Sequence, residues 1–272
     1  MALRSVPPVR RHAEAGDSEL SVLAVIPARY ASSRLPGKPL VSLAGKPMIQ
    51  HVCERVRRAE RVSRVLVATD DERILQVVAG FGGEAVMTRA DHHTGTERVA
   101  EVAASSAGRD AEILVNVQGD EPLIDPAAVD AAVEALETDP AVLVGTLAVP
   151  IDRPAEIMDP NIVKVVLDFE GNALYFSRAP IPWVRGNGVP VRAHHLKHLG
   201  LYVFRRAALL EFPTLPQGEL EKLEQLEQLR WLENGYKIRV AETTYDSISV
   251  DVAEDVPRVE KLLRERAASQ SG

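Results

Sequence analysis

The sequence has a single cysteine, Cys53, among its 272 residues, so an intrachain disulfide cannot form. Four apolar residues share one side of a predicted helix with it: Met48, Ile49, Val52 and Val56. This spacing predicts that Cys53 belongs to the hydrophobic core and is not a nucleophile.

Long apolar runs are also missing. No stretch approaches the roughly 18 apolar residues that cross a bilayer, and the N-terminal MALRSVPPVRRHAEAGDSEL lacks the apolar region of a secretory signal. We therefore expect a cytoplasmic protein with no membrane partner. Positive charge is in deficit, since the formal net charge is -7 and the pI is about 5.6. That balance argues against nucleic-acid binding by bulk electrostatics, so the basic groups must act locally.

Several chemical signatures are absent as well. The chain has no dinucleotide G-x-G-x-x-G, no G-x-x-x-x-G-K-[ST] loop and no Gly-x-Ser-x-Gly elbow. Among the histidines His92, His93, His194, His195 and His198, only the pair His194 and His198 has the i, i+4 spacing of a helical metal site. That pair adjoins the strand-like KHLGLYVF, with no third soft ligand nearby, which argues against zinc.

What is present is an alternation of apolar strands and amphipathic helices. With 46% hydrophobic residues, the chain can bury a large core. Residues 1–20 have no periodicity and predict a disordered extension. We predict that residues 21–272 form one α/β domain with a mostly parallel central sheet. Residues 151–217 are β-rich and rich in turn signals, which predicts a smaller mixed or antiparallel subdomain.

Two stretches near the C-terminus need a specific prediction. Leucines repeat every three residues in the predicted helix 218–235, and this repeat does not fit a coiled-coil seam. That helix is expected either to be buried over a wide arc or to be irregular at its start. A last helix is predicted over residues 252–267, where Pro257 would fall past the first turn and could force a restart.

The stretch VLAVIPARYASSRLPGKPL joins a buried-looking strand to a loop with three fixed positive charges, Arg29, Arg34 and Lys38. Serines and a glycine lie between them, so that backbone N–H groups and cations can converge on one polyanion. Pro36 and Pro39 stiffen the loop, which favours this interpretation over a solvated basic connector.

A second candidate feature is Asp120, in the sequence Gln-Gly-Asp-Glu-Pro at the end of the apolar strand EILVNV. Open parallel sheets bind ligands at this edge. Asp251 follows another strand and offers a second carboxylate, and Mg²⁺ binds one or two carboxylates together with phosphate oxygens. The alternative for Asp120 alone is a capping role in the following turn.

These residues lie within a longer resemblance, carried in order by IPARYASSRLPGKPL, VATDDE, TRADHHTGTERVAEV, VNVQGDEP, VKVVLD, ALYFSRAPIPW, KHLGLYVF and LEQLRWL. Together they closely resemble the motifs of the CMP-Kdo synthetase (3-deoxy-manno-octulosonate cytidylyltransferase) family, from about residue 22 to 263. The resemblance implies a Rossmann-like nucleotidyltransferase fold and a homodimer formed through residues 151–217. It also implies a Mg²⁺-dependent enzyme of lipopolysaccharide biosynthesis that uses CTP and a sugar acid, Kdo, to make CMP-Kdo and pyrophosphate.

The resemblance also implies roles for individual residues. Catalytic positions would be Arg29, Arg34, Lys38 and Asp120. Nucleotide-binding positions would be Pro27, Ala28, Arg29, Arg89, Lys38, Thr94, Gly95, Thr96, Gln118 and Gly119. Acceptor-binding positions would be Arg178, His198, Tyr202, Glu227 and Gln228, with Arg178 pairing with the acceptor carboxylate. The metal ligands would be Asp120 and Asp251.

The chain departs from the family pattern in three places. Where the family usually has Gly-x-Asp-Thr-Pro-Glu-Asp, residues 249–255 read Ser-Val-Asp-Val-Ala-Glu-Asp, so the carboxylate is kept in an altered setting. The loop 186–195 is shorter than in the family, and the N-terminal extension is unusual. Two alternatives therefore stand beside Kdo: a related enzyme that activates a phosphonate or another ulosonic acid, and a non-catalytic nucleotide-binding protein.

Overall fold

The computed structural model describes residues 20–32, 34–185, 195–246 and 248–270. The predicted disordered extension, apart from Leu20, lies outside the described residues, and so do Ser33, most of the loop 186–195 and His194. Among the described helices, none is long and apolar enough to cross a membrane.

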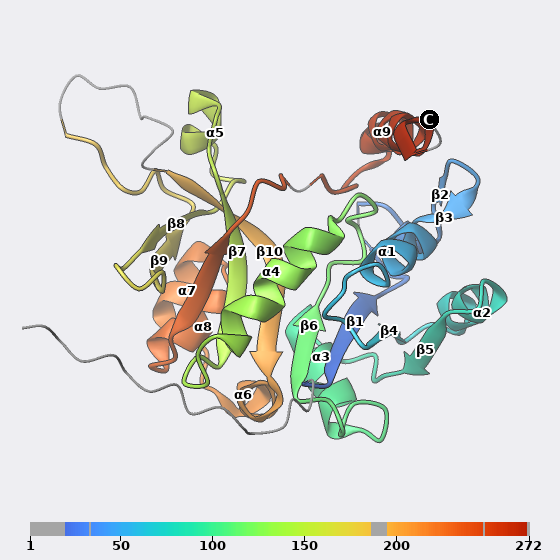
Figure 1. Cartoon of the computed structure of the whole chain (residues 1–272), viewed down its shortest axis with the longest axis horizontal. Coiled ribbons are helices and arrows are strands. Elements are labelled where there is room, and N and C mark those ends of the chain that lie inside the picture. The colour runs from blue at the N-terminus through green and yellow to red at the C-terminus, as the bar shows by residue number, and fades with distance from the viewer. Residues whose placement is uncertain (1–19, 33, 186–194, 247, 271–272) are drawn as a thin grey trace, which may run out of the picture.

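Strands and helices alternate along most of the chain (Figure 1). The strands are β1 (Val22–Ala28), β2 (Ser42–Leu43), β3 (Lys46–Pro47), β4 (Arg64–Thr69), β5 (Glu84–Met87), β6 (Ile113–Asn116), β7 (Val144–Pro150), β8 (Lys164–Leu167), β9 (Ala173–Ser177), β10 (Leu196–Arg205) and β11 (Ile238–Glu242). The α-helices are α1 (Met48–Val56), α2 (Glu72–Gly80), α3 (Gly95–Ala104), α4 (Pro126–Glu137), α5 (Pro154–Met158), α6 (Arg206–Glu211), α7 (Glu219–Glu224), α8 (Gln228–Glu233) and α9 (Val256–Gln270). Short 3₁₀ turns are η1 (Lys38–Leu40), η2 (Phe212–Thr214) and η3 (Ala253–Asp255).

One sheet organises the domain, with strand order β11-β7-β10-β6-β1-β4-β5 and the β8–β9 hairpin attached to β10. Strands β6, β1, β4 and β5 are parallel. Strand β10 runs antiparallel to both β6 and β7, and β11 is parallel to β7. The sheet is therefore parallel where the predicted phosphate loop leaves it and mixed on the other side, which confirms the predicted fold class.

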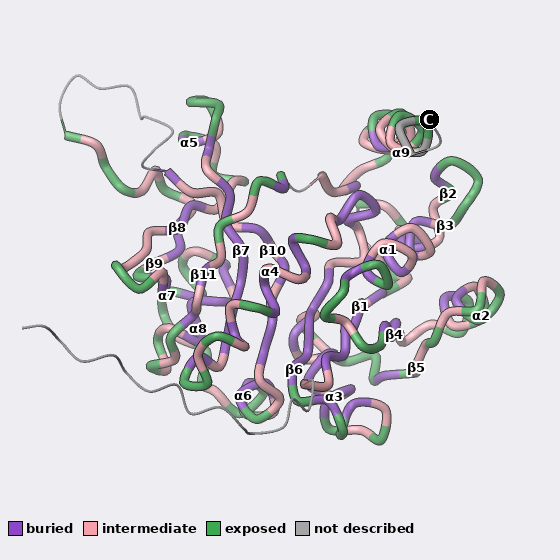
Figure 2. Tube along the Cα trace, viewed as in Figure 1, coloured by how far each residue is buried: buried purple, intermediate pink, exposed green. Residues whose placement is uncertain are grey.

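Helices cover both faces of the sheet, as the buried strands between them show (Figure 2). On one face, β1 and β6 residues pack against α1, α2 and α4, around side chains such as Ile49, Ile74 and Val129. On the other face, α3, α6 and α8 supply residues that include Val99 and Trp231. Cys53 is buried within the first of these clusters, as predicted from its position on the apolar side of α1.

Local sequence explains several element boundaries. Helix α4 begins at Pro126 because Asp125 caps its first turn, accepting from the Ala127 N–H at 3.2 Å, and Pro126 occupies the first helical position. In α3 the cap is Thr94, which accepts from the Glu97 N–H at 3.1 Å. Asp and Thr are both favoured at this capping position, so the local sequence fixes both helix starts.

Two predictions near the C-terminus are corrected. The segment 218–235 forms two short helices, α7 and α8, because Gln225 adopts a left-handed conformation with φ 52° and ends the first helix. Leu220 and Leu223 are exposed, whereas Leu226 and Leu229 are buried, so the leucines are not buried over a wide arc. The last helix begins at Val256, which puts Pro257 in its first turn, where proline removes no helical hydrogen bond.

Residues 151–217 supply the β8–β9 hairpin beside the main sheet (Figure 1). They also supply β10, which lies between β6 and β7 in the sheet itself. The segment is therefore joined to the core through a shared strand. Its role in acceptor binding and dimerisation stays a prediction.

Candidate functional site

The site is built where β1 and β6 end side by side. Parallel pairing of Val25 with Asn116 brings the residues after each strand to the same edge of the sheet. The two backbone segments approach closely there, since a Cβ added to Gly119 would lie 3.1 Å from the Pro27 carbonyl oxygen. Glycine at position 119 therefore lets the loop after β6 lie directly against the end of β1.

The basic loop after β1 is held in a compact turn. The Gly37 N–H donates to the Tyr30 carbonyl at 3.0 Å, and the Arg73 guanidinium stacks over the Tyr30 ring at 3.3 Å from its centroid. Gly37 has φ 68°, a conformation that favours glycine. Immediately after it, Lys38 begins η1. The turn thus fixes where the Lys38 side chain leaves the backbone.

This loop lines a cavity of about 470 Å³. Eleven residues from the loop and the β6 end line it: Pro27, Ala28, Arg29, Ala31, Ser32, Arg34, Lys38, Pro39, Gln118, Gly119 and Asp120. All three predicted phosphate-binding cations are in this set, and Arg29 and Arg34 are exposed. The geometry therefore gathers the cations around one space, as the loop sequence predicted.

The Lys38 ammonium joins the two predicted metal ligands. Its Nζ lies 2.5 Å from Asp120 Oδ2 and 3.3 Å from Asp251 Oδ1, and the Arg34 guanidinium lies 3.1 Å from the same Asp251 oxygen. The Val250 N–H donates to the Asp120 carbonyl at 3.0 Å, which ties the two segments together through the main chain. Two carboxylates distant in sequence thus converge on one point.

The carboxylates of Asp120 and Asp251 fit a Mg²⁺ site. Mg²⁺ usually binds one or two carboxylates and completes its coordination shell with phosphate oxygens and water. The cavity beside the two carboxylates leaves room for these oxygens. Within the described part of the chain, no group of three or more His, Cys, Asp or Glu side chains gathers as a metal site. The arrangement therefore favours an ion that shares its shell with a phosphate-bearing substrate.

The altered segment around Asp251 has its own internal support. The Asp255 carboxylate accepts from the Asp251 N–H at 2.8 Å and from the Val252 N–H at 3.0 Å. The hydrogen bond from the Val252 N–H, followed by that from the Asp251 N–H, lowers the pKa of Asp255 below its usual value. Ser249 also donates to Asp251 Oδ2 at 3.3 Å. Residues 249–255 thus hold Asp251 both by its backbone N–H and by its carboxylate.

The N-terminus of α3 packs against the end of β1 beside this site. A Cβ on Gly95 would lie 3.3 Å from Pro27 Cγ, so this helix start lies close against the end of β1. Thr96 is buried and donates to Glu227 Oε1. The other oxygen of Glu227, Oε2, is buried with no hydrogen-bond partner among the described residues. Burial raises the pKa of Glu227, which marks this carboxyl as a group that lacks its full set of donors.

A second cavity, of about 620 Å³, lies next to the first, and Gln118 lines both. The Gln118 side chain donates to the Gly200 carbonyl at 3.0 Å. Of the five predicted acceptor-binding residues, four line this second cavity: His198, Tyr202, Glu227 and Gln228. The predicted nucleotide-binding residue Thr94 lines it too. The structure therefore places the predicted phosphate and acceptor residues in adjoining spaces that share one side chain.

His198 is held as a neutral ring. The Thr146 hydroxyl lies 3.0 Å from His198 Nε2 and 2.8 Å from the Leu201 carbonyl, which is positioned to take the hydroxyl proton. The Nε2–H then donates to Thr146 Oγ1, which sets the tautomer. The ring packs edge-on against Phe176, and burial lowers the pKa of His198 to about 3. His198 can therefore donate or accept hydrogen bonds without bringing a charge.

Five predicted site residues line neither cavity: Arg89, Gly95, Thr96, Arg178 and Asp251. The Arg178 guanidinium donates to the carbonyls of Glu224, Pro160 and Gln225 at 2.8, 2.9 and 3.4 Å, and so braces the end of α7. Arg89 is exposed and paired with Asp91 at 2.7 Å. Contacts of Arg178 with an acceptor and of Arg89 with a nucleotide stay predictions.

Sequence reasoning missed Lys197, which lines the second cavity and pairs with Asp246 at 2.7 Å. Asn161 and Ser249 line it as well. Alternation along KHLGLYVF puts Lys197 and His198 on opposite faces of β10, so no local pattern predicts that both line one cavity.

The sequence is similar to those of known cytidylyltransferases. A family model described as Cytidylyltransferase matches residues 23–238. The 3-deoxy-manno-octulosonate cytidylyltransferase of Syntrophotalea carbinolica is 57% identical over 90% of this chain and 99% of its own. The enzyme of the same name from Solibacter usitatus is 54% identical over 89% of this chain and 94% of its own.

Solved structures agree. A CMP:2-keto-3-deoxy-manno-octonic acid synthetase complexed with CTP superposes with a TM-score of 0.85 at 44% identity, covering 90% of this chain and 99% of its own. A 4-diphosphocytidyl-2C-methyl-D-erythritol synthase from Anaerococcus prevotii has a TM-score of 0.62 at 14% identity, which shows a common fold. The chain belongs to the cytidylyltransferase family and, within it, to the 3-deoxy-manno-octulosonate cytidylyltransferases.

Proposed function

We propose that this protein transfers CMP from CTP to the sugar acid Kdo, giving CMP-Kdo and pyrophosphate. The observation that carries the proposal is the position of the Lys38 ammonium between Asp120 and Asp251, at the edge of a cavity lined by Arg29 and Arg34. Identity of 57% to a named 3-deoxy-manno-octulosonate cytidylyltransferase supports the choice of CTP and Kdo.

The reaction needs little covalent chemistry from the protein. An acceptor hydroxyl attacks the α-phosphorus of CTP, the new O–P bond forms as the bond to the β-phosphate oxygen breaks, and the hydroxyl proton is released. Arg29, Arg34 and Lys38 line the cavity in which the triphosphate would lie. They would hold the triphosphate in line and offset the charge on the departing pyrophosphate.

Magnesium would be held by Asp120 and Asp251, and when bound it would neutralise phosphate charge. The lysine that now lies between these carboxylates is 13% exposed in its side chain, so it is a largely enclosed cation. Lys38 would then contact phosphate oxygens beside the metal, because both lie at the same end of the cavity. These roles concern the CTP half of the site and are the same for any acceptor.

The second cavity is the proposed acceptor site. His198, Tyr202 and Gln228 present neutral hydrogen-bonding groups, which suits the hydroxyls of a sugar. The acceptor's carboxylate needs a cation, and Lys197 is the residue with a fixed positive charge among those that line this cavity. Burial, followed by the charge of Glu227, raises the pKa of Tyr202, so this phenol stays protonated and able to donate.

A pyrophosphate-release assay tests the proposal, using CTP, Mg²⁺ and a panel of acids that contains Kdo, another ulosonic acid and a phosphonate. We expect turnover with Kdo and its loss by at least about 100-fold in Asp120→Asn, since one metal carboxylate is removed. Asp110→Asn, an exposed carboxylate outside both cavities, serves as the matched control. Turnover with a phosphonate but not with Kdo would reject Kdo as the acceptor. Near-normal turnover by Asp120→Asn would reject the metal assignment.

We further propose a cytoplasmic homodimer formed through residues 151–217. Four of the large hydrophobic side chains that are exposed belong to this segment: Met158, Phe169, Leu174 and Trp183. Leu174 is 62% exposed on β9, and Trp183 is 78% exposed just beyond that strand. Exposed apolar side chains gathered on one segment are typical of an interaction surface.

Light scattering after gel filtration tests the dimer. The wild type is expected at twice the chain mass, and Leu174→Asp is expected to shift it towards the monomer because the charge would be buried in the interface. Leu223→Asp, on an exposed leucine of α7, is the control. A monomeric wild type would contradict the proposal.

A further inference from the structure

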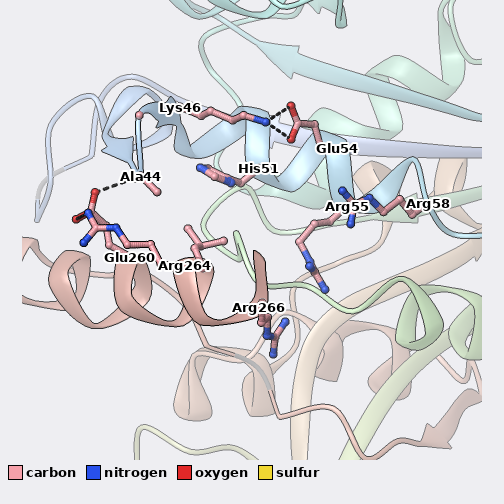
Figure 3. Close-up of a pocket in the computed structure, with 11 residues that line it drawn as sticks. Ala44, Lys46, His51, Glu54, Arg55, Arg58, Glu260, Arg264 and Arg266 are labelled. Atoms are coloured by element: carbon pink, nitrogen blue, oxygen red, sulfur yellow. Dashed lines mark hydrogen bonds and ion pairs between the residues drawn. The ribbon is translucent and has the colours of Figure 1, made fainter. Parts of the chain in front are cut away.

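A cavity outside the proposed active site lies between α1, the β2–β3 hairpin and α9 (Figure 3). Its volume is about 570 Å³, within the range of small-molecule sites. It shares no lining residue with the two cavities described above. The residues that line it are Ala44, Gly45, Lys46, His51, Glu54, Arg55, Arg58, Glu260, Leu263, Arg264 and Arg266.

The cavity is positive although the chain as a whole has a net charge of -7. Both of its carboxylates are already paired. Glu54 accepts from Lys46 Nζ at 2.7 and 2.8 Å. Glu260 accepts from the Ala44 N–H at 2.7 Å and lies 3.2 Å from the Arg264 guanidinium. The other arginines that line the cavity are Arg55, Arg58 and Arg266.

These three arginines have few counter-charges. Arg55 reaches from α1 towards α9, and Arg266 lies on the facing end of that helix (Figure 3). Arg58 is exposed, and within the described residues its guanidinium makes no hydrogen bond or ion pair. Burial lowers the pKa of Arg55, and the positive charges of Arg266 and Arg58 lower it further. The negative charge of Asp125 has the opposite effect. Three guanidinium groups therefore repel one another around a space that a dianion would fill.

The remaining hydrogen bonds of this cluster hold the loop that carries Asp120. Arg55 Nε donates to the Ile124 carbonyl, and Arg266 Nη1 donates to the Leu123 carbonyl at 3.0 Å. Each guanidinium has five N–H donors, so the donors that these bonds leave free can contact a ligand. Arg55 and Arg266 are thus fixed in position by the backbone of a neighbouring loop.

We propose that this cavity is a second anion site, which takes the phosphate group of a small phosphorylated molecule between Arg55, Arg58 and Arg266. Planar guanidinium groups bind phosphate oxygens through paired N–H donors, and the dianion would relieve their mutual repulsion. Because Arg55 lies in the last turn of α1, Arg58 lies just beyond that helix and Arg266 belongs to α9, the bound phosphate joins the two elements. The space beyond the phosphate is lined by Ala44, Gly45 and Leu263 and accommodates the rest of the ligand.

Equilibrium dialysis with labelled inorganic phosphate tests the site, with the full chain saturated with CTP and no acceptor, so that the triphosphate loop is filled. Phosphate is expected to bind, and Arg58→Ala is expected to weaken it about tenfold, the effect of losing one charge-assisted hydrogen-bond partner. Arg57→Ala is the matched control, because Arg57 is adjacent, equally charged and exposed, but does not line the cavity. Absence of phosphate binding, or equal binding by the two variants, would overturn the proposal.

Amide hydrogen exchange gives a second readout. Phosphate should slow exchange in α9 in the wild type and in Arg57→Ala, since the ligand bridges this helix to α1, and should have a smaller effect in Arg58→Ala. A potassium chloride solution of equal ionic strength controls for screening. Exchange in α9 that phosphate leaves unchanged in the wild type would overturn the bridging geometry.

Discussion

The neutral state of His198 predicts a loss of stability in mild acid. Burial lowers the pKa of His198 to about 3, against an ordinary value near 6.5 in the unfolded chain. The unfolded state therefore binds the proton more tightly, and unfolding is favoured as the pH falls below about 6.5. Linkage then gives a loss of about 2 kcal/mol between neutral pH and pH 5 from this one residue.

The measurement is urea unfolding at several pH values between 7.5 and 5, for the wild type and for His198→Gln. Glutamine cannot titrate and keeps a donor for Thr146, so the variant should lose about 2 kcal/mol less than the wild type over this range. His93→Gln, on an exposed residue that lines the same cavity, controls for removing a histidine. Equal pH dependence of the wild type and His198→Gln would refute the argument that burial keeps this ring neutral.

Three further predictions concern the folded state. Arg178→Ala should lower the free energy of unfolding by about 1–3 kcal/mol in urea titrations, because three carbonyls lose their donor; an unchanged midpoint would contradict the bracing role. Gly145→Ala should cost about 1–3 kcal/mol, since its Cβ would lie 2.5 Å from Leu136 Cδ1, whereas Gly80→Ala, with open space around it, should change stability by less than about 0.5 kcal/mol. Burial raises the pKa of Cys53 to about 12, so a thiol reagent at pH 8 should label it only in denaturant, and rapid labelling of the native protein would contradict its burial.

The sequence predicted those parts of the fold that depend on local signals. The start of helix α4 is such a case, because Asp125 and Pro126 define it chemically. The break at Gln225 could not be predicted in the same way, since a non-glycine residue rarely adopts the left-handed conformation and no turn residue marks this position. The place of β10 between β6 and β7 likewise depends on pairing between distant segments, which no local pattern encodes.

The candidate site divides in a similar way. Arg29, Lys38 and Asp120 were predicted together because each follows a strand whose carboxyl end lies at the same edge of the sheet. Arg178 differs from these residues: the resemblance implies contact with the acceptor, which stays a prediction, and in the structure its guanidinium donates to three backbone carbonyls. Which partner a long side chain selects depends on the carbonyls that folding leaves unpaired nearby, and these are fixed only by the complete structure.

The contact between Asp120 and the segment around Asp251 has a consequence for the order in which the protein is made. Lys38 and Asp251 are 213 residues apart, and the Val250 N–H that meets the Asp120 carbonyl comes almost as late in the chain. Synthesis proceeds from the N-terminus, so a growing chain displays its basic loop long before the second carboxylate emerges. Such an intermediate carries Arg29, Arg34 and Lys38 but only one of the two carboxylates, Asp120. The contact between the Asp120 and Asp251 segments can therefore form only after nearly the whole polypeptide has been translated.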